Sequence, residues 1–224
     1  MKPKIIFVEG NIGAGKTTFL KNINIPQLNI QKIFEPVSEW IQSGMLDKFY
    51  KNPDKYAYEF QLYCLKTRFE LFKKIDTTVD YVFIERSPMC DKFVFAQVCL
   101  ENKPEQLQQY HDIWNEYMNT IYTTEYNYDF HFLYINDTAE NCHKHICDRA
   151  RQEETNISLD YLQKLEERHN TWFNHHDQIL YNHFTYHTKD NHCYINTYGF
   201  DIRYSDNVDN IVLNTIQYIQ NRDI

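Results

Sequence analysis

The sequence predicts an α/β fold in which a five-stranded parallel sheet is flanked by helices. Short runs of apolar, β-branched or aromatic residues alternate with longer stretches of helical period, which is typical of this class. Several of the short runs are continuously apolar, as expected for strands that are covered on both faces. A glycine-rich segment with the spacing of a phosphate-binding loop directly follows the first run.

Each strand is expected where such a run occurs. The first run, at residues 4–8, ends at the glycine-rich segment, and the runs at 30–34 and 81–84 each end at ionisable residues. The fourth and fifth strands are expected at 130–135 and 193–196. Helices are expected between the strands, at residues 17–22, 54–75, 88–100, 107–124, 159–182 and 207–220.

Two segments of the second half differ in pattern. Leu159, Leu162 and Leu165 recur every three residues and indicate a core-facing helical stripe. Residues 149–157 are charged and lack an apolar period, which predicts a mobile lid over the site. A length of 224 residues without an internal repeat or a low-complexity linker predicts one domain over residues 1–224.

The amino-acid composition limits the kinds of binding partner and the cellular location that we expect. The chain has 31 Asp and Glu against 23 Lys and Arg, a net charge of -8, and no basic stripe, so nucleic acid is not expected as a partner. The six cysteines are scattered, as in reduced intracellular proteins. No stretch of apolar residues is long enough to span a membrane, and the first expected strand leaves no room for a leader. We expect a cytoplasmic protein without membrane contact.

Two histidine-containing segments invite a metal interpretation. Cys142, His143, His145 and Cys147 fall within six residues, but they lie in a segment with helix signals, and no second ligand pair has zinc-finger spacing. A helix is therefore favoured over a zinc site. The pair at residues 175–176 is likewise expected on a solvated helix face.

The glycine-rich segment runs from Glu9 to Thr18 and satisfies the spacing G-x-x-x-x-G-K-[ST]. Its glycines permit positive φ and close approach of the backbone to phosphates. Lys16 supplies a point charge for the β- and γ-phosphates, and the Thr17 hydroxyl is the expected Mg²⁺ ligand. The expected nucleotide-binding residues are Gly10, Asn11, Ile12, Gly13, Ala14, Gly15, Lys16, Thr17 and Thr18.

Ionisable residues follow the second and third strands. Glu35 follows the second strand, and Glu85 and Arg86 follow the third. In an open α/β sheet ligands bind at the carboxyl ends of the strands, so these side chains are expected beside the phosphate loop. Either cluster alone is as readily a surface salt bridge. The agreement of three strand ends favours an active site.

Helical spacing groups further polar residues. Gln61, Cys64 and Arg68 are three and four residues apart and share one helix face, as do Asp91 and Phe95. The carboxamide of Gln61 offers both a donor and an acceptor to a base edge. Phe95 is placed to stack on a base and Asp91 to pair with Arg68, although a core phenylalanine and a structural ion pair would give the same pattern.

The segments EGNIGAGKTT, EPVSEW, FQLYCLKTR, ERSPMCD and RARQEE occur in the order and approximate spacing of the deoxyribonucleoside kinases, which the chain resembles over roughly residues 4 to 185. The resemblance implies a P-loop NTPase fold and transfer of the γ-phosphoryl group of ATP to the 5′-hydroxyl of a deoxynucleoside in nucleotide salvage. It implies Mg²⁺ held by Thr17 and Glu85, and a homodimer joined through helices.

The resemblance also implies residue roles. Glu35 is the general base or orients the acceptor hydroxyl, Arg86 holds the 5′-oxygen, and Lys16, Arg149 and Arg151 stabilise the transferring phosphoryl group. Tyr50 and Glu154 clamp the sugar 3′-hydroxyl. The base is implied to lie among Trp40, Phe60, Gln61, Cys64, Arg68, Asp91 and Phe95.

The Arg68 and Asp91 combination matches the deoxycytidine and deoxyguanosine kinase branch, so deoxycytidine or purine deoxynucleosides are expected over thymidine. Two positions depart from the family pattern. His145 stands where relatives commonly carry an arginine, and residues 196–201 match the adenine loop poorly. These departures leave open whether ATP is preferred over other donors.

Two alternatives remain at this point. A thymidylate or other nucleoside-monophosphate kinase shares the phosphate loop and lid, but it must neutralise a phosphate on its acceptor, for which Glu35 and a single Arg86 are poorly suited. A nucleotide-dependent switch or scaffold would leave Glu35 and Glu85 without a chemical task, and the chain lacks an N-K-x-D segment for guanine.

Overall fold

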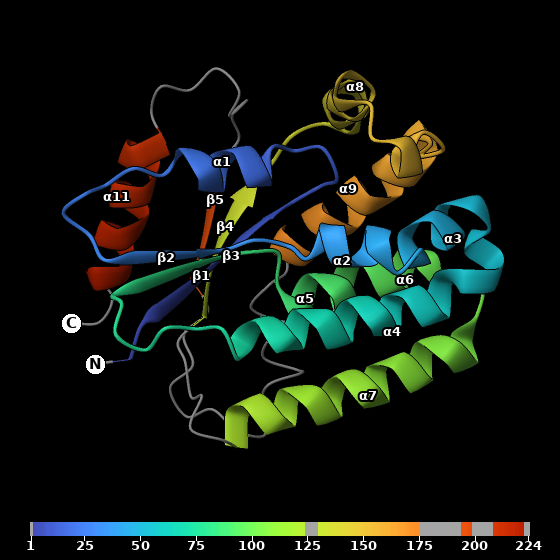
Figure 1. Cartoon of the computed structure of the whole chain (residues 1–224), viewed down its shortest axis with the longest axis horizontal. Helices are drawn as coiled ribbons and strands as arrows, with labels where there is room; N and C mark the ends of the chain where they lie inside the picture. The colour runs from blue at the N-terminus through green and yellow to red at the C-terminus, as the bar shows by residue number, and fades with distance from the viewer. Residues whose placement is uncertain (1, 124–129, 175–193, 199–207, 222–224) are drawn as a thin grey trace.

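The computed structural model describes residues 2–123, 130–174, 194–198 and 208–221. Within these residues, five parallel strands form a sheet in the order β2-β3-β1-β4-β5 (Figure 1). The strands are β1 (Lys4–Gly10), β2 (Ile30–Ile33), β3 (Tyr81–Glu85), β4 (Phe130–Ile135) and β5 (Tyr194–Tyr198). The predicted parallel α/β sheet is confirmed. Cys193, predicted to begin the fifth strand, lies outside the described residues.

The central strand explains the continuous apolar pattern. In β1, Ile5, Ile6, Phe7 and Val8 have no exposed surface, because β3 and β4 flank the strand and helices cover both faces. Phe7 packs on Phe132 and Phe130, with ring centroids 5.6 Å and 5.4 Å away. This buried strand places the phosphate loop at the middle of the carboxyl edge of the sheet.

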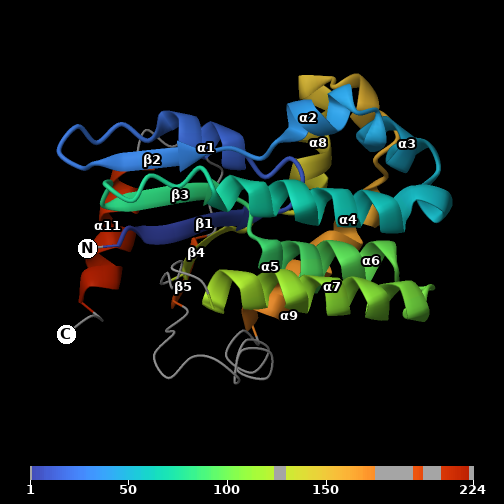
Figure 2. The ribbon, with the colours of Figure 1, turned by 60° about the horizontal axis from the view of Figure 1, so that its bottom comes forward.

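The helices lie around and beyond the sheet. Figure 1 shows α1 (Lys16–Asn22) beside α11 (Val208–Gln220), and Figure 2 shows α4 (Pro53–Phe72) running along α7 (Pro104–Thr123). The helix α9 (Leu159–Asn174) packs against α8 (Ala139–Arg149). The expected helices near 54–75, 107–124, 159–182 and 207–220 are therefore present with shifted ends, although residues 175–182, which include the histidine pair, lie outside the described residues.

The prediction of one regular helix over residues 88–100 was wrong in detail. The segment forms α5 (Pro88–Cys90), a π-helical turn η1 (Asp91–Phe95) and α6 (Ala96–Cys99). Pro88 suits the first helical turn, where its missing N–H costs nothing, and the Ser87 side chain accepts a hydrogen bond from Cys90 N. The wider π turn is a local distortion of the kind found at functional sites.

Two short helices were not predicted. They are α2 (Val37–Gln42) and α3 (Met45–Lys51), which are 6 and 7 residues long, too short to show a helical period. The predicted lid, 149–157, begins at the last residue of α8 and contains a short 3₁₀ turn, η2 (Gln152–Glu154). Ala150 adopts φ 49, which ends α8 in the left-handed conformation.

Candidate active site

The loop between β1 and α1 has the backbone of a phosphate cradle. Gly13 and Gly15 have φ values of 86 and 89, which other residues adopt at a cost. A Cβ on Gly13 would lie 2.4 Å from the carbonyl oxygen of Cys142 in α8. Asn11 Nδ2 donates to Leu162 O in α9 at 2.9 Å. The loop is thus held between two helices from the second half of the chain.

Lys16 is folded onto this loop. Its Nζ donates to Gly10 O at 3.0 Å and to Asn11 O at 2.7 Å, and the side chain is buried. Burial, and to a smaller extent the positive charge of Arg86, lower the pKa of Lys16 to about 8. Both of these acceptors are neutral carbonyl oxygens, and an anionic phosphate would give the Lys16 ammonium a negatively charged partner.

Hard oxygen ligands meet at the start of α1. Thr17 Oγ1 donates to Glu85 Oε1 at 2.6 Å, and Glu85 Oε2 accepts from the backbone N–H of Glu35 at 3.3 Å. The strands β1 and β3 are neighbours, so the two oxygens come together at their carboxyl ends. A hydroxyl and a carboxylate beside a phosphate loop fit the oxygen ligands of Mg²⁺.

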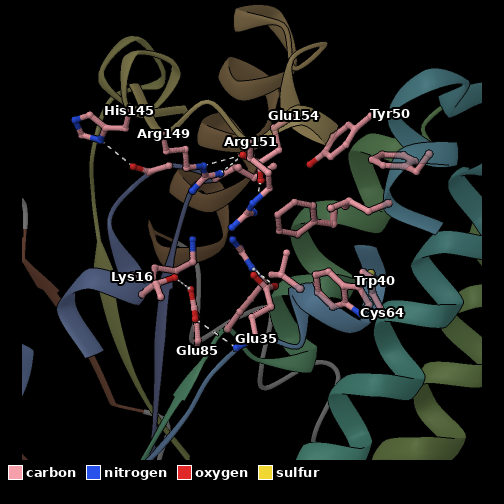
Figure 3. A pocket seen from close by; sticks show the side chains of 18 of the residues that line it. Lys16, Glu35, Trp40, Tyr50, Cys64, Glu85, His145, Arg149, Arg151 and Glu154 are labelled. Atoms are coloured by element: carbon pink, nitrogen blue, oxygen red, sulfur yellow. Dashed lines mark hydrogen bonds and ion pairs between the residues drawn. The ribbon is translucent and has the colours of Figure 1, made fainter. Parts of the chain in front are cut away.

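Glu35, labelled in Figure 3, is paired with one arginine of α4 and with another that directly follows β3. Its Oε1 accepts from Arg86 Nε at 3.1 Å and from Arg68 Nη2 at 2.9 Å. Burial alone would raise the pKa of Glu35, but Arg86 and Arg68 lower it to about 2. The carboxylate is therefore ionised at all physiological pH values.

Arg68 connects Glu35 to Asp91. Its Nε lies 2.5 Å from Asp91 Oδ2, and the side chains of both partners are 2% exposed. Asp91 sits in the π turn, so that distortion brings a carboxylate to the face of α4. The predicted pairing of Arg68 with Asp91 is present.

A cavity of about 390 Å³ extends from the phosphate loop to α3. Trp40 and Phe60 lie edge to face with centroids 5.8 Å apart, and Phe60 stacks on Phe49 at 4.8 Å. Gln61 Oε1 is buried without a hydrogen-bond partner among the described residues, so the amide has an acceptor left for a ligand. The predicted site residues that line this cavity are Ile12, Gly13, Gly15, Lys16, Thr17, Thr18, Glu35, Trp40, Tyr50, Phe60, Gln61, Cys64, Arg68, Glu85, Arg86, Asp91, Phe95, Arg149, Arg151 and Glu154.

Charged residues of the predicted lid pair with one another. Glu154, which is 4% exposed, accepts from Arg149 Nη2 at 2.5 Å and from Arg151 Nη1 at 2.6 Å (Figure 3). Each arginine side chain is about one third exposed, at 36% and 33%. Burial and then the charge of Glu154 raise the pKa of Tyr50, which keeps its hydroxyl protonated. A neutral hydroxyl and a carboxylate therefore both line the cavity.

Some lining residues were not predicted. Phe49 and Leu46 lie on α3 beside Tyr50, and Tyr161 reaches the cavity from α9. Leu46 is four residues before Tyr50, so one helical turn relates it to a predicted residue. Gly10, Asn11 and Ala14 belong to the loop but do not line the cavity.

The cysteines and histidines of α8 do not converge. His145 Nδ1 lies 2.8 Å from Gly13 O, whereas Cys142 Sγ faces Asp137 O at 4.0 Å. Cys147 and His143 are one turn apart on a more exposed face, 3.9 Å from each other. The four residues therefore occur close together in the sequence as part of helix α8, and the sequence had favoured this interpretation over a zinc site. Of residues 196–201, the last three lie outside the described residues.

No helix within the described residues has both the length and the apolar character needed to cross a membrane. A parallel sheet, a P-loop and a cavity lined by Glu35, Arg86 and Arg68 define a P-loop phosphotransferase that acts on a small acceptor.

Comparison with known proteins identifies the family within this class of phosphotransferases. A family model described as deoxynucleoside kinase matches residues 6–212. A fowlpox virus protein named "Probable deoxycytidine kinase" is 31% identical over 173 residues, which cover 75% of this chain and 71% of the relative. Human deoxycytidine kinase is 31% identical over 199 residues, 77% of this chain and 76% of the relative. Deoxycytidine kinase 1 of Xenopus laevis is 28% identical over 203 residues, 78% and 75% of the two chains.

The chain belongs to the deoxynucleoside kinase family. It is an ATP-dependent deoxynucleoside kinase, whose small-molecule substrates are a nucleoside and ATP. This assignment decides against the two alternatives, a monophosphate kinase and a nucleotide-dependent switch.

Proposed function

We propose that the enzyme phosphorylates the 5′-hydroxyl of deoxycytidine or of a purine deoxynucleoside in preference to thymidine, in cytoplasmic nucleotide salvage. The observation that carries the base preference is the buried Arg68–Asp91 ion pair, which lines the cavity together with Gln61. A fixed ion pair at this position leaves little room for the methyl group of thymine, and Gln61 offers an unpaired acceptor to an amino group.

The donor side is supplied by the loop from Gly10 to Thr18. Its N–H groups and Lys16 hold the phosphates of ATP, and Arg149 and Arg151 approach them from the lid. Thr17 and Glu85 would hold Mg²⁺, which neutralises phosphate charge when bound. The 2.6 Å contact between their oxygens supports this assignment.

The acceptor side is supplied by Glu35 and Arg86. Arg86 holds the 5′-oxygen, and Glu35 accepts the hydrogen bond of the 5′-hydroxyl. A carboxylate with a pKa of about 2 is a weak base. Glu35 therefore orients the hydroxyl early and receives its proton late, after bond formation to phosphorus has made the oxygen acidic.

The remaining contacts fix the nucleoside. Tyr50 and Glu154 clamp the 3′-hydroxyl, and Trp40, Phe60, Cys64 and Phe95 enclose the base. Residues 149–157 close over both substrates as a lid of the single domain. Lid closure would exclude water, which otherwise competes as the acceptor.

We further propose a homodimer, as the family resemblance implies. The sequence offered the helices beginning at residues 54 and 88 as the dimer surface, but Phe60, Phe69, Phe72 and Phe95 are buried within the chain. A dimer interface on these helices would therefore be formed by residues other than these four. Light scattering after size-exclusion chromatography tests the state, and a single species at the mass of 27.3 kDa would contradict it.

A panel of acceptors tests the preference. We expect kcat/KM with ATP and Mg²⁺ to be higher for deoxycytidine or a purine deoxynucleoside than for thymidine, and thymidine monophosphate to be inert. GTP and UTP in place of ATP test the donor. Thymidine ranking first would contradict the proposal on the base, and a faster reaction with another triphosphate would contradict the proposal on the donor.

Glu35→Gln tests the acceptor chemistry. We expect kcat to fall by about 10²- to 10⁴-fold, because the amide cannot receive the proton. Glu39→Gln is a matched control, since Glu39 lies four residues further on and its side chain, among the described residues, accepts only from Tyr63 Oη at 3.2 Å. Full activity of Glu35→Gln would contradict the mechanism.

A further inference from the structure

A buried polar cluster lies directly behind Arg86. Glu9 of β1, Cys90 of α5 and His169 of α9 bring a carboxylate oxygen, a sulfur and an imidazole nitrogen within 4.8 Å of one another. All three side chains have no exposed surface. None of them touches the cavity, and the sequence did not predict any of them as a site residue.

The direction of the hydrogen bonds in this cluster is fixed. His169 Nδ1 lies 2.7 Å from Leu165 O, and a carbonyl oxygen can only accept, so Nδ1 carries the proton of the neutral ring. His169 Nε2 is then an acceptor, and the Cys90 thiol, 3.4 Å away, donates to it. The sulfur keeps its lone pairs and accepts from Arg86 Nη1 at 3.2 Å.

The protonation states of His169 and Cys90 agree with these hydrogen-bond directions. Burial and then the nearby Arg86 lower the pKa of His169 well below its usual value, so the ring is neutral. Burial raises the pKa of the Cys90 thiol, which therefore keeps its proton. A metal ion would need the thiolate, and Arg86 Nη1 already donates to the sulfur. Cys90 and His169 therefore form a hydrogen-bond chain to Arg86 rather than part of a metal site, while Glu9 Oε1 accepts from Ser87 N.

Arg86 needs this support because its backbone is unusual. It has φ 66, which is costly for a residue with a Cβ, and Glu9 Oε1 holds the next residue by accepting from Ser87 N at 2.8 Å. The side chain is fixed by Glu35 at Nε and by Cys90 at Nη1, with the Phe95 ring centroid 4.5 Å from Cζ. Among the described residues Nη2 has no hydrogen-bond partner, which leaves it for a ligand.

We infer that Cys90 and His169 are positioning residues for phosphoryl transfer, which hold the Arg86 guanidinium in the orientation that meets the acceptor oxygen. This inference rests on the proposed role of Arg86. Helix α9 then supports both halves of the site, because Leu162 O holds Asn11 of the phosphate loop while His169 holds Arg86 through Cys90.

Kinetics of substitutions at Cys90 test the inference. In Cys90→Ala the sulfur is lost, and we expect kcat to fall about tenfold or more with nucleoside KM changed less than about threefold, since a misplaced catalytic group costs mainly rate. Cys90→Ser can make both hydrogen bonds and should recover kcat to within about threefold of the parent. Val94→Ala is the packing control, because Val94 is equally buried in the next turn and its side chain has no polar atom.

Arg86 variants separate the two proposals. If Arg86→Ala kept full activity, the proposed role of Arg86 would fail. If Arg86→Ala lost activity while Cys90→Ala had the same kcat as the control Val94→Ala, only the positioning inference would be overturned. We expect Cys90→Ala to have no further effect on kcat in the Arg86→Ala background.

A measurement on the unaltered protein does not depend on any variant folding. With ¹⁵N-labelled histidine, NMR should show His169 as the Nδ1–H tautomer from pH 5.5 to 8.5, assigned by loss of its signals in His169→Phe or, should that variant not fold, by through-bond connection to its backbone. The Nε2–H tautomer, or titration of the ring in this range, would overturn the inference.

Discussion

At the scale of single residues, Asp91 is the carboxylate of the site that responds to pH near neutrality. Burial raises the pKa of Asp91 to about 6, although Arg68 opposes the change. Above this pH the Asp91 carboxylate holds Arg68, and below it the protonated acid holds Arg68 less firmly. Glu35, whose pKa the arginines lower to about 2, does not change charge over the same range.

We therefore predict that base discrimination weakens in acid. The ratio of kcat/KM for deoxycytidine to that for thymidine should fall about three- to tenfold between pH 7.5 and pH 5.5. Asp91→Asn is the control, and its ratio should be low and independent of pH. A parent ratio that stays constant while Asp91→Asn lowers it would show that Asp91 does not titrate in this range.

The Arg68–Asp91 pair also predicts coupled stability effects. Arg68→Met alone leaves Asp91 buried without its 2.5 Å partner and should lower the free energy of unfolding by about 3 to 5 kcal/mol. Adding Asp91→Leu should restore part of this loss and relax discrimination against thymidine. Urea unfolding of the two single variants and the double variant measures the coupling, and strictly additive losses would contradict it.

Residues of the site differ in how far the sequence predicts them. Glu35, Glu85 and Arg86 were found because a position at the carboxyl end of a strand is a local property. Cys90 and His169 are 79 residues apart and meet only through the packing of α9 against the π turn. No period or motif relates two such residues, so only the structure shows their contact.

At the scale of elements, the phosphate loop and α8 depend on one glycine. Gly13→Ala would place a Cβ 2.4 Å from Cys142 O and keep φ 86, so the loop or the helix must move. We expect KM for ATP to rise about tenfold or more, and the free energy of unfolding to fall by about 1 to 3 kcal/mol.

Gly44→Ala is the matched control for this change. Gly44 has φ 71, but a Cβ there meets nothing within 4 Å, so the variant bears only the backbone cost of about 1 to 2 kcal/mol. Its KM for ATP should be unchanged. Equal effects of the two variants on KM would show that contact with α8 is not what positions the loop.

Elements were predicted from the sequence where they are long or fully buried. The strands β1, β3 and β4 are continuous apolar runs, and their ends were placed within two residues. Helices α2 and α3 are too short to be periodic, and the π turn depends on the burial of Asp91, Lys92 and Val94 by the rest of the molecule. Tertiary packing decided these elements, and single-sequence patterns do not contain it.

At the scale of the whole molecule, the residues that line the cavity are spread along the chain from Ile12 to Tyr161. The phosphate loop follows β1, the proposed acceptor residues Glu35 and Arg86 follow β2 and β3, and the proposed lid connects α8 to α9 (Figure 1). Glu154 links the two substrates, because it is proposed to clamp the 3′-hydroxyl while it holds Arg149 and Arg151. Ordering the lid for one substrate therefore prepares it for the other.

This arrangement predicts positive coupling between donor and acceptor. A non-hydrolysable ATP analogue with Mg²⁺ should tighten deoxynucleoside binding about fivefold or more, and by linkage the nucleoside should tighten binding of the analogue by the same factor. Isothermal titration calorimetry in both orders measures the two factors. In Glu154→Gln we expect the coupling to be lost, because the amide no longer holds two arginines. Equal nucleoside affinity with and without the analogue would show that the lid serves the two substrates independently.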